Sequence, residues 1–185
     1  MDGRKRIVYI SALIAIASVL QIAESLFPHP VPWLRLGLAN MITLASLVIF
    51  GYAVAIQVAV LRTILSSFLL GTFFTPGFLL SFSGALMSAL VMGGIYNLGR
   101  MGKGNPSTHH LTGFSIVGVS ILGALTHNLT QLFVAYFFLI RHKGIFMILP
   151  FLIAAAVVTG FITGYGANYL SREMRKITLE AGKPC

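Results

Sequence analysis

The chain has 185 residues, of which 57% are hydrophobic and only 9% are charged, and its mean hydropathy is +0.90. A soluble domain of this size does not need so much apolar surface, so the composition predicts a single integral membrane domain over residues 1–185. The formal net charge of +9 does not indicate nucleic-acid binding, because the basic residues cluster at the ends of apolar segments. There they are expected to act as topology signals and to contact anionic lipid headgroups. The one cysteine, Cys185, excludes an intrachain disulfide and a Cys-based metal site.

Six apolar segments predict an all-α membrane protein with six transmembrane helices. A spanning helix needs about 20 mostly apolar residues, and the segments cover approximately residues 7–27, 38–50, 52–70, 76–98, 114–140 and 146–170. The first segment carries small residues close to one turn apart at Ser11, Ala12 and Ala15. Small residues let helices approach closely in lipid. This strip is therefore predicted either to pack inside the bundle or to form a docking face for a partner protein.

The second and third helices are predicted to form a hairpin. Prolines between residues 28 and 32 break the first helix and leave a short loop. Arg35 precedes the second helix, and Asn40 lies near its start. Gly51 marks a tight turn into the third helix, which carries Arg62 near its middle.

The fourth helix is predicted to begin at Pro76, because a proline is well tolerated in a first helical turn. Ser81 and Ser83 follow near its start. A polar loop over residues 99–113 contains His109 and His110. No third ligand lies nearby, so this pair is expected to be solvated and no metal site is predicted.

The fifth helix has polar residues in the middle of a long apolar run, at His127, Asn128 and Gln131. Polar side chains at this depth are costly and usually face a bundle interior or a cavity. Residues three and four apart are neighbours on a helix, so these side chains can share a face. The sixth helix has a close-packing strip of small residues at four-residue spacing, Ala156, Gly160 and Gly164.

The distribution of basic residues predicts that both termini lie in the cytoplasm, with the chain in the plasma or inner membrane. Most of the 13 basic residues then fall on the cytoplasmic side, near the two ends of the chain and in the loop before the fifth helix. Arg35, Arg141 and Lys143 fall outside, and Arg62 lies within the membrane.

With this topology, the polar residues of the predicted helices fall between the midplane and the outer surface, given a rise of about 1.5 Å per residue. This shared depth predicts an outward-facing cavity that binds a small molecule. Its expected lining residues are Arg35, Asn40, Arg62, Ser81, Ser83, His127, Asn128 and Gln131. The two serines are equally well explained as hydrogen-bonding contacts between helices.

Arg62 indicates the charge of the expected ligand. A charged arginine near the midplane costs roughly 2.5 kcal/mol or more unless it is paired or hydrated. The one acidic residue of the predicted spans, Glu24, is expected near the outer end of the first helix, away from Arg62. A cavity poor in acids that holds Arg62, Arg35 and His127 favours an anion such as a carboxylate or a phosphate. We therefore expect Arg62 to contribute more to ligand binding than to folding.

The sequence resembles the Gx transporter family, which is also named heptaprenyl diphosphate synthase component I. The resemblance is carried by Arg35–Leu44 with its LGLAN motif, by Leu61–Leu65 with Gly71, by Pro76–Gly84, and by Gly118–Gln131 with its GA-x-x-HN-x-x-Q motif. It implies a relationship to the substrate-binding S components of energy-coupling-factor vitamin transporters. Those proteins are six-helix bundles that dock on a transmembrane T subunit driven by two ATPases, through small residues of the first helix. Ser11, Ala12 and Ala15 match that docking surface only loosely.

The two family names imply different functions, and the acidic residues distinguish them. Soluble helical prenyl synthases hold magnesium diphosphate on paired Asp-rich motifs, and magnesium prefers carboxylates. Here the acids outside the membrane are only Asp2, Glu173 and Glu180, so such a motif cannot form. The sequence also lacks a P-loop and a G-x-S-x-G nucleophile elbow. No catalytic residue and no cofactor are therefore predicted.

The expected function is that of a substrate-binding membrane subunit of an uptake transporter of the S-component type, for a vitamin-like, cofactor-like or anionic amphipathic small molecule. Its energy would come from partner proteins, such as a T subunit and ATPases, or from an ion gradient. The alternative is a non-catalytic membrane component associated with polyprenyl diphosphate or quinone side-chain synthesis, with a prenyl synthase as the partner.

Overall fold

The computed structural model describes residues 3–26, 37–101 and 115–180. Over these ranges the chain forms only helices: α1 (Gly3–Leu26), α2 (Leu38–Phe50), α3 (Tyr52–Leu69), α4 (Pro76–Met101), α5 (Ile116–Phe138), the 3-10 helix η1 (Lys143–Ile148) and α6 (Leu149–Glu180). The predicted all-α bundle of six helices is confirmed. Arg35, the proline-rich segment before it and the histidine pair at 109–110 lie outside the described residues.

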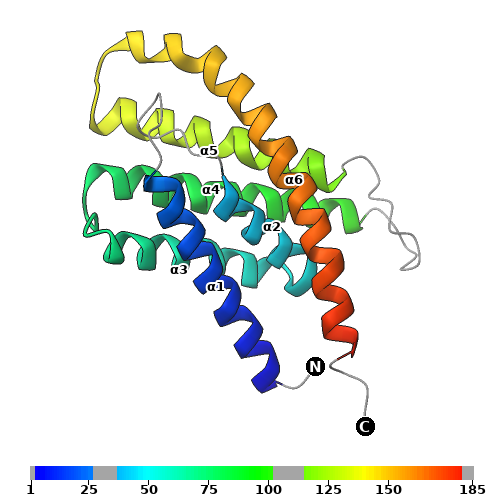
Figure 1. Ribbon diagram of the computed structural model, residues 1–185. Coiled ribbons are helices and arrows are strands. Elements are labelled where there is room, and N and C mark those ends of the chain that lie inside the picture. Colours follow the sequence, from blue (N-terminus) through cyan, green and yellow to red (C-terminus); the bar gives the residue numbers. More distant parts are fainter. Residues whose placement is uncertain (1–2, 27–36, 102–114, 181–185) are drawn as a thin grey trace.

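In the described part of the chain, five helices are long and apolar enough to cross a membrane, and α2 is the exception. The chain is therefore a multi-pass membrane protein. Figure 1 shows α3, α4 and α5 lying side by side, whereas α1 and α6 cross them obliquely. The N-terminal end of α1 and the C-terminal end of α6 lie at the same end of the molecule in this view.

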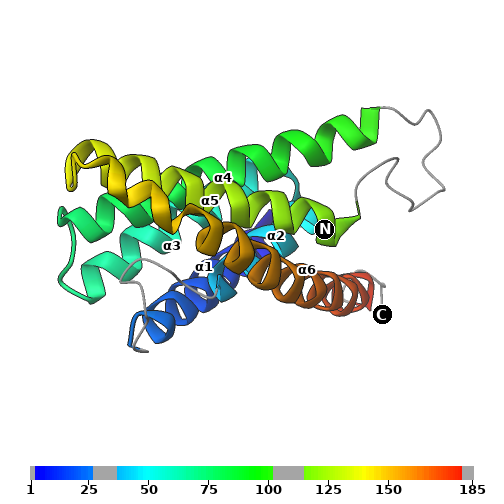
Figure 2. The ribbon, with the colours of Figure 1, turned by 90° about the horizontal axis from the view of Figure 1, so that it is seen from above.

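The short helix α2 lies in the interior of the bundle. Its 13 residues span about 20 Å, well short of the roughly 30 Å of a bilayer core. It packs against α1, α3 and α6, and Figure 2 shows it between these helices. Most of its residues are buried. From the Gly51 turn, α2 is therefore too short to cross a bilayer core, and its N-terminal end lies among the other helices.

Two glycines set the ends of α2. Gly37, the residue before the helix, has a φ of +80°, and Gly51, at the turn into α3, has a φ of +93°. This left-handed region is costly for residues with a Cβ and is open to glycine. The Gly51 turn lets α3 return beside α2. Asn40 and Arg62 are each eleven residues from Gly51, on opposite arms of this hairpin, so they lie at the same depth.

Two of the three apolar core clusters among the described residues include α2. One cluster joins Leu44 and Leu47 of α2 to Met92 of α4 and Val119 of α5. A second joins Ile42 of α2 to residues of α1 and α3. One face of α2 thus packs against α4 and α5, and another face packs against α1 and α3.

The small-residue strip of α6 packs inside the bundle, on α5. A Cβ built on Gly160 would lie 2.6 Å from the Cα of Ile121, and one on Gly164 would lie 2.8 Å from the Cα of Val117. Because these contacts are with backbone, neither position has room for a side chain. The strip accounts for the close approach of α5 and α6.

The helix α6 extends ten residues beyond the predicted end at residue 170. Hydropathy identifies only its apolar part, whereas the helix continues through a charged segment that includes Arg172 and Arg175. Within this extension Lys176 forms an ion pair with Glu173 at 2.7 Å, one helical turn away. The helix also begins later than predicted, at Leu149, because residues 143–148 form a 3-10 turn.

Candidate functional site

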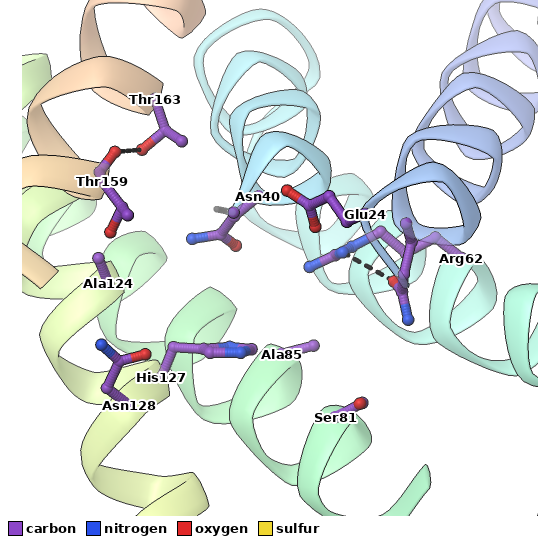
Figure 3. A pocket seen from close by; sticks show the side chains of 12 residues that line it. Glu24, Asn40, Arg62, Ser81, Ala85, Ala124, His127, Asn128, Thr159 and Thr163 are labelled. Carbon is purple, nitrogen blue, oxygen red and sulfur yellow. Dashed lines mark hydrogen bonds between the residues drawn. The ribbon is translucent and has the colours of Figure 1, made fainter. Parts of the chain in front are cut away.

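A small internal cavity lies beside the N-terminal end of α2, and all six α-helices or their caps contribute to its wall (Figure 3). Its volume is about 30 Å³, which is room for water but less than most small-molecule sites provide. The lining residues are Gln21, Glu24, Gly37, Asn40, Arg62, Ser81, Ala85, Ala124, His127, Asn128, Thr159 and Thr163. Polar residues from segments far apart in the sequence therefore meet at one point.

Arg62 reaches this cavity from α3 and is held by α1. Its Nη1 donates a hydrogen bond of 2.9 Å to Oε1 of Gln21. The exposed fraction of each residue is 4%. A guanidinium buried in this way requires polar partners, and Gln21 supplies one of them from the neighbouring helix.

Glu24 lines the same cavity, one helical turn after Gln21. Its carboxylate accepts the backbone N–H of Leu38, the first residue of α2. The first N–H groups of a helix have no partner within the helix, and the helix dipole favours an anion there. Glu24 is 2% exposed, so α2 begins against a buried carboxylate.

The position of Glu24 corrects the expectation that it lies away from Arg62. That expectation assumed that α1 stands upright in the membrane, so that the depth of a residue follows from the rise per residue. Because α1 crosses α3 obliquely (Figure 1), the position of its residues relative to α3 does not follow from the rise per residue, and Glu24 is buried. Glu24 and Arg62 therefore line one cavity, which holds one acidic and one basic side chain.

Asn40 projects from the first turn of α2 toward the centre of the site (Figure 3). Its Nδ2 donates to Oγ of Ser88 on α4 at 3.2 Å, and Ser88 donates in turn to the carbonyl oxygen of Gly123 on α5 at 2.9 Å. Its Oδ1 is buried and has no hydrogen-bond partner among the described residues. A buried acceptor of this kind is satisfied by a water molecule or a ligand that donates a hydrogen bond.

His127 lies against α4 because residue 84 is a glycine. A Cβ at Gly84 would lie 2.9 Å from Cε1 of His127 and 3.0 Å from Cγ of Gln131. The neighbouring Asn128 is anchored to α6, since its Nδ2 donates to the carbonyl oxygen of Leu152 at 3.1 Å. The two polar residues at the centre of α5 therefore contact different neighbouring helices.

The α6 wall consists of two threonines four residues apart, Thr159 and Thr163. The hydroxyl of Thr163 lies 2.8 Å from that of Ser120 on α5 and also donates to the carbonyl oxygen of Thr159 at 2.8 Å. The sequence interpretation missed these threonines and Gln21. The sequence did contain a signal for them, because Thr159 and Thr163 are polar residues four apart, and Gln21 and Glu24 are polar residues three apart, within apolar helices.

Five of the eight predicted lining residues meet at the cavity, namely Asn40, Arg62, Ser81, His127 and Asn128. Ser83 does not, because it lies two positions from Ser81 and so points to another side of α4, where it donates to the carbonyl oxygen of Leu79 at 2.7 Å. Gln131 does not, because its side chain fills the contact with Gly84. Arg35 lies outside the described residues.

The small residues Ser11, Ala12 and Ala15 are exposed on the outer face of α1. The alternative that this strip packs inside the bundle is therefore not supported. In the described ranges, no three of the histidine, cysteine, aspartate and glutamate side chains gather as metal ligands.

The fold and the site define a multi-pass helical membrane protein with a polar cavity at its centre. A family model described as heptaprenyl diphosphate synthase component I matches residues 13–170. The chain belongs to the heptaprenyl diphosphate synthase component I family, in agreement with the resemblance seen in its motifs.

Among solved structures, the chain is similar to one described as "Structure and mechanism of the S component of a bacterial ECF transporter". The TM-score is 0.68, and the match covers 96% of this chain and 99% of the other at 23% sequence identity. At this identity the similarity shows a shared fold. No curated protein sequence matches the chain.

Proposed function

We propose that the chain is the substrate-binding membrane subunit of a small-molecule uptake transporter of the energy-coupling-factor S-component type. The observation that carries the proposal is the central cavity, where Arg62, Glu24 and Asn40 are buried together in a fold similar to that of an S component. Ionisable side chains within membrane-spanning helices are energetically costly and commonly mark substrate or ion pathways.

The charges in the wall narrow the class of ligand. The sequence suggested an anion, because Arg62 had no acidic neighbour. With Glu24 in the same wall, the cavity holds one carboxylate and one guanidinium. We infer a polar ligand with little net charge that directs an electronegative group at Arg62 and a hydrogen-bond donor at Oδ1 of Asn40.

The partners of this proposal are a transmembrane T subunit and ATPase subunits. The exposed strip of Ser11, Ala12 and Ala15 lies around the middle of α1, whereas Gln21 and Glu24 lie in its last two turns. One helix would thus carry a docking surface near its middle and part of the ligand site near its C-terminal end. The close approach that small residues permit suits helix docking within lipid.

The family description favours a second candidate, a non-catalytic membrane component of polyprenyl diphosphate synthesis. Gentle purification of the tagged chain from its own cells separates the two. A co-purifying T subunit and ATPases, with a retained polar small molecule in native mass spectra, support the transporter subunit. A co-purifying soluble prenyl synthase, with no such small molecule, supports the second candidate and contradicts the first.

A further inference from the structure

A second cavity of about 240 Å³ lies between α1, α3, the turn after α3 and the start of α4. It shares Gln21 and Ser81 with the wall of the central cavity, so the two spaces are adjacent. Gln21 is also the residue that holds Arg62. The pair of Gln21 and Ser81 therefore forms the boundary between a small charged cavity and a larger one.

The larger cavity has six hydroxyl groups in its wall and no charged side chain among its described lining residues. We name it the hydroxyl compartment, after Ser25, Ser66, Ser67, Thr72, Thr75 and Ser81. These hydroxyls come from three helices and one turn, so no single amphipathic helix accounts for them.

The hydrogen bonds of these hydroxyls determine what they can offer to a ligand. Ser25 donates to the carbonyl oxygen of Ile22 at 2.6 Å, Ser66 to that of Thr63 at 3.1 Å, and Ser81 to that of Gly77 at 2.8 Å. A hydroxyl has one hydrogen to donate and two lone pairs that accept. Thr75 likewise donates to the carbonyl oxygen of Thr72 at 2.6 Å, so four of the six hydroxyls use their hydrogen within their own segment and offer only an acceptor oxygen.

Serine and threonine often bond in this way to their own helix in membranes, and such bonds alone carry no ligand. Here, however, side chains do not fill the space between the hydroxyls. A polar cavity of this size holds water or a polar guest, whereas only apolar cavities stay dry. The central cavity, at about 30 Å³, is too small to hold a substrate alone.

We propose that the hydroxyl compartment is a second part of the ligand site and that it takes the hydrogen-bond-donating end of the ligand, such as a hydroxyl, an amide N–H or an ammonium group. The electronegative end lies at Arg62, and the ligand passes between Gln21 and Ser81. This inference rests on the proposed function. It adds which end of the ligand accepts hydrogen bonds and which end donates them.

The test uses cysteine chemistry and needs no knowledge of the ligand. Ser67→Cys is made in a Cys185→Ser background, because Ser67 lines the compartment and is 4% exposed. Its rates of reaction are measured with methanethiosulfonates that carry an aminoethyl, a hydroxyethyl or a sulfonatoethyl group, each relative to the rate with a free thiol. Ser46→Cys, on α2 and fully buried away from both cavities, is the matched control.

We expect the aminoethyl and hydroxyethyl reagents to modify Ser67→Cys about tenfold faster than the sulfonatoethyl reagent, whose sulfonate can only accept hydrogen bonds. None of the three reagents should modify Ser46→Cys at a comparable rate. Equal or faster reaction of the sulfonate, or reaction no faster than at Ser46→Cys, would overturn the proposal. Ser25→Cys repeats the test on α1 if Ser67→Cys does not fold.

A second measurement separates this inference from the proposed function. Native mass spectra are compared for Ser67→Cys before and after modification by the aminoethyl reagent. Loss of a retained small molecule on modification supports the compartment as part of the site. Retention of the molecule after complete modification overturns the proposal that the compartment is part of the site, and leaves the transporter proposal standing. If the unmodified wild type retains no molecule, the transporter proposal itself is contradicted.

Discussion

The side chains of Arg62 on α3 and Gln21 on α1 are joined by a hydrogen bond of 2.9 Å while both are almost fully buried. This contact fixes the position of the guanidinium in the wall of the central cavity and ties the α2–α3 hairpin to α1. Glu24, one turn along α1 from Gln21, accepts the first backbone N–H of α2. Two residues on one face of α1 thus bind the Arg62 side chain and the first residue of α2, both of which contribute to the site.

The burial of Glu24 changes what an Arg62 substitution should do. Arg62→Met removes the donor to Gln21 and leaves the buried Glu24 carboxylate without a cation in the same cavity. A buried polar group without its partner costs about 1–3 kcal/mol, so we expect a lower melting temperature in detergent. Glu24→Gln in the same chain should restore part of the loss. Equal melting temperatures of wild type and Arg62→Met would show that the two side chains are not coupled.

Gly84→Ala should weaken the packing of α4 on α5. The added Cβ would meet His127 and Gln131 at about 3 Å, and overpacking of this kind typically costs about 1–3 kcal/mol. Gly94→Ala on the same helix is the control, because a Cβ there has no neighbour within 4 Å. We expect a lower melting temperature for the first variant and an unchanged or higher one for the second. The reverse order would mean that His127 is not held against Gly84.

The docking surface proposed on α1 is tested by a bulky side chain at one of its small residues. Ala15→Phe should abolish co-purification of a T subunit, since close helix contact needs small side chains. It should leave the melting temperature unchanged, because Ala15 is exposed in the isolated chain. Val157→Phe, on the exposed face of α6, is the control and should leave partner binding intact. Normal co-purification with Ala15→Phe would place the partner elsewhere.

The orientation of the chain remains a prediction of its basic residues. Single cysteines at positions 30, 74 and 105, of which only 74 is among the described residues, are labelled in intact cells with a reagent that does not cross the membrane. Positions 30 and 74 should react from outside and position 105 only after lysis. Labelling of position 105 in intact cells would reverse the topology.

Much of the fold could be predicted because hydropathy reports directly on burial in lipid. The start and end of α2, for example, follow from Gly51 and the apolar run before it. Two aspects could not. The oblique path of α1, which brings Glu24 to Arg62, depends on packing that residue spacing does not record. The extension of α6 past residue 170 is polar, so hydropathy does not detect it.

The candidate site was predicted in part for a related reason. Arg62 and His127 stood out because each is polar at the centre of an apolar helix, and Asn40 because it is polar near the start of one. Gln21 and the α6 threonines were missed because their role here depends on residues of neighbouring helices, which the sequence alone does not place beside them. Ser83 shows the opposite error, since depth alone does not tell which side of a helix a residue faces.

The most direct test of the central claim compares the small molecule retained by the wild type with that retained by the double variant Arg62→Met, Glu24→Gln. The double variant removes both charges of the cavity together, so it should fold, and a thermal melt verifies that it does. Native mass spectrometry of the gently purified proteins should show a bound polar molecule on the wild type. The folded double variant should have lost most of it, because a charge-assisted hydrogen bond contributes about 1.5–3 kcal/mol, or about tenfold or more in affinity. Equal retention of the same molecule by both proteins would contradict the account and place the ligand outside the Arg62 cavity.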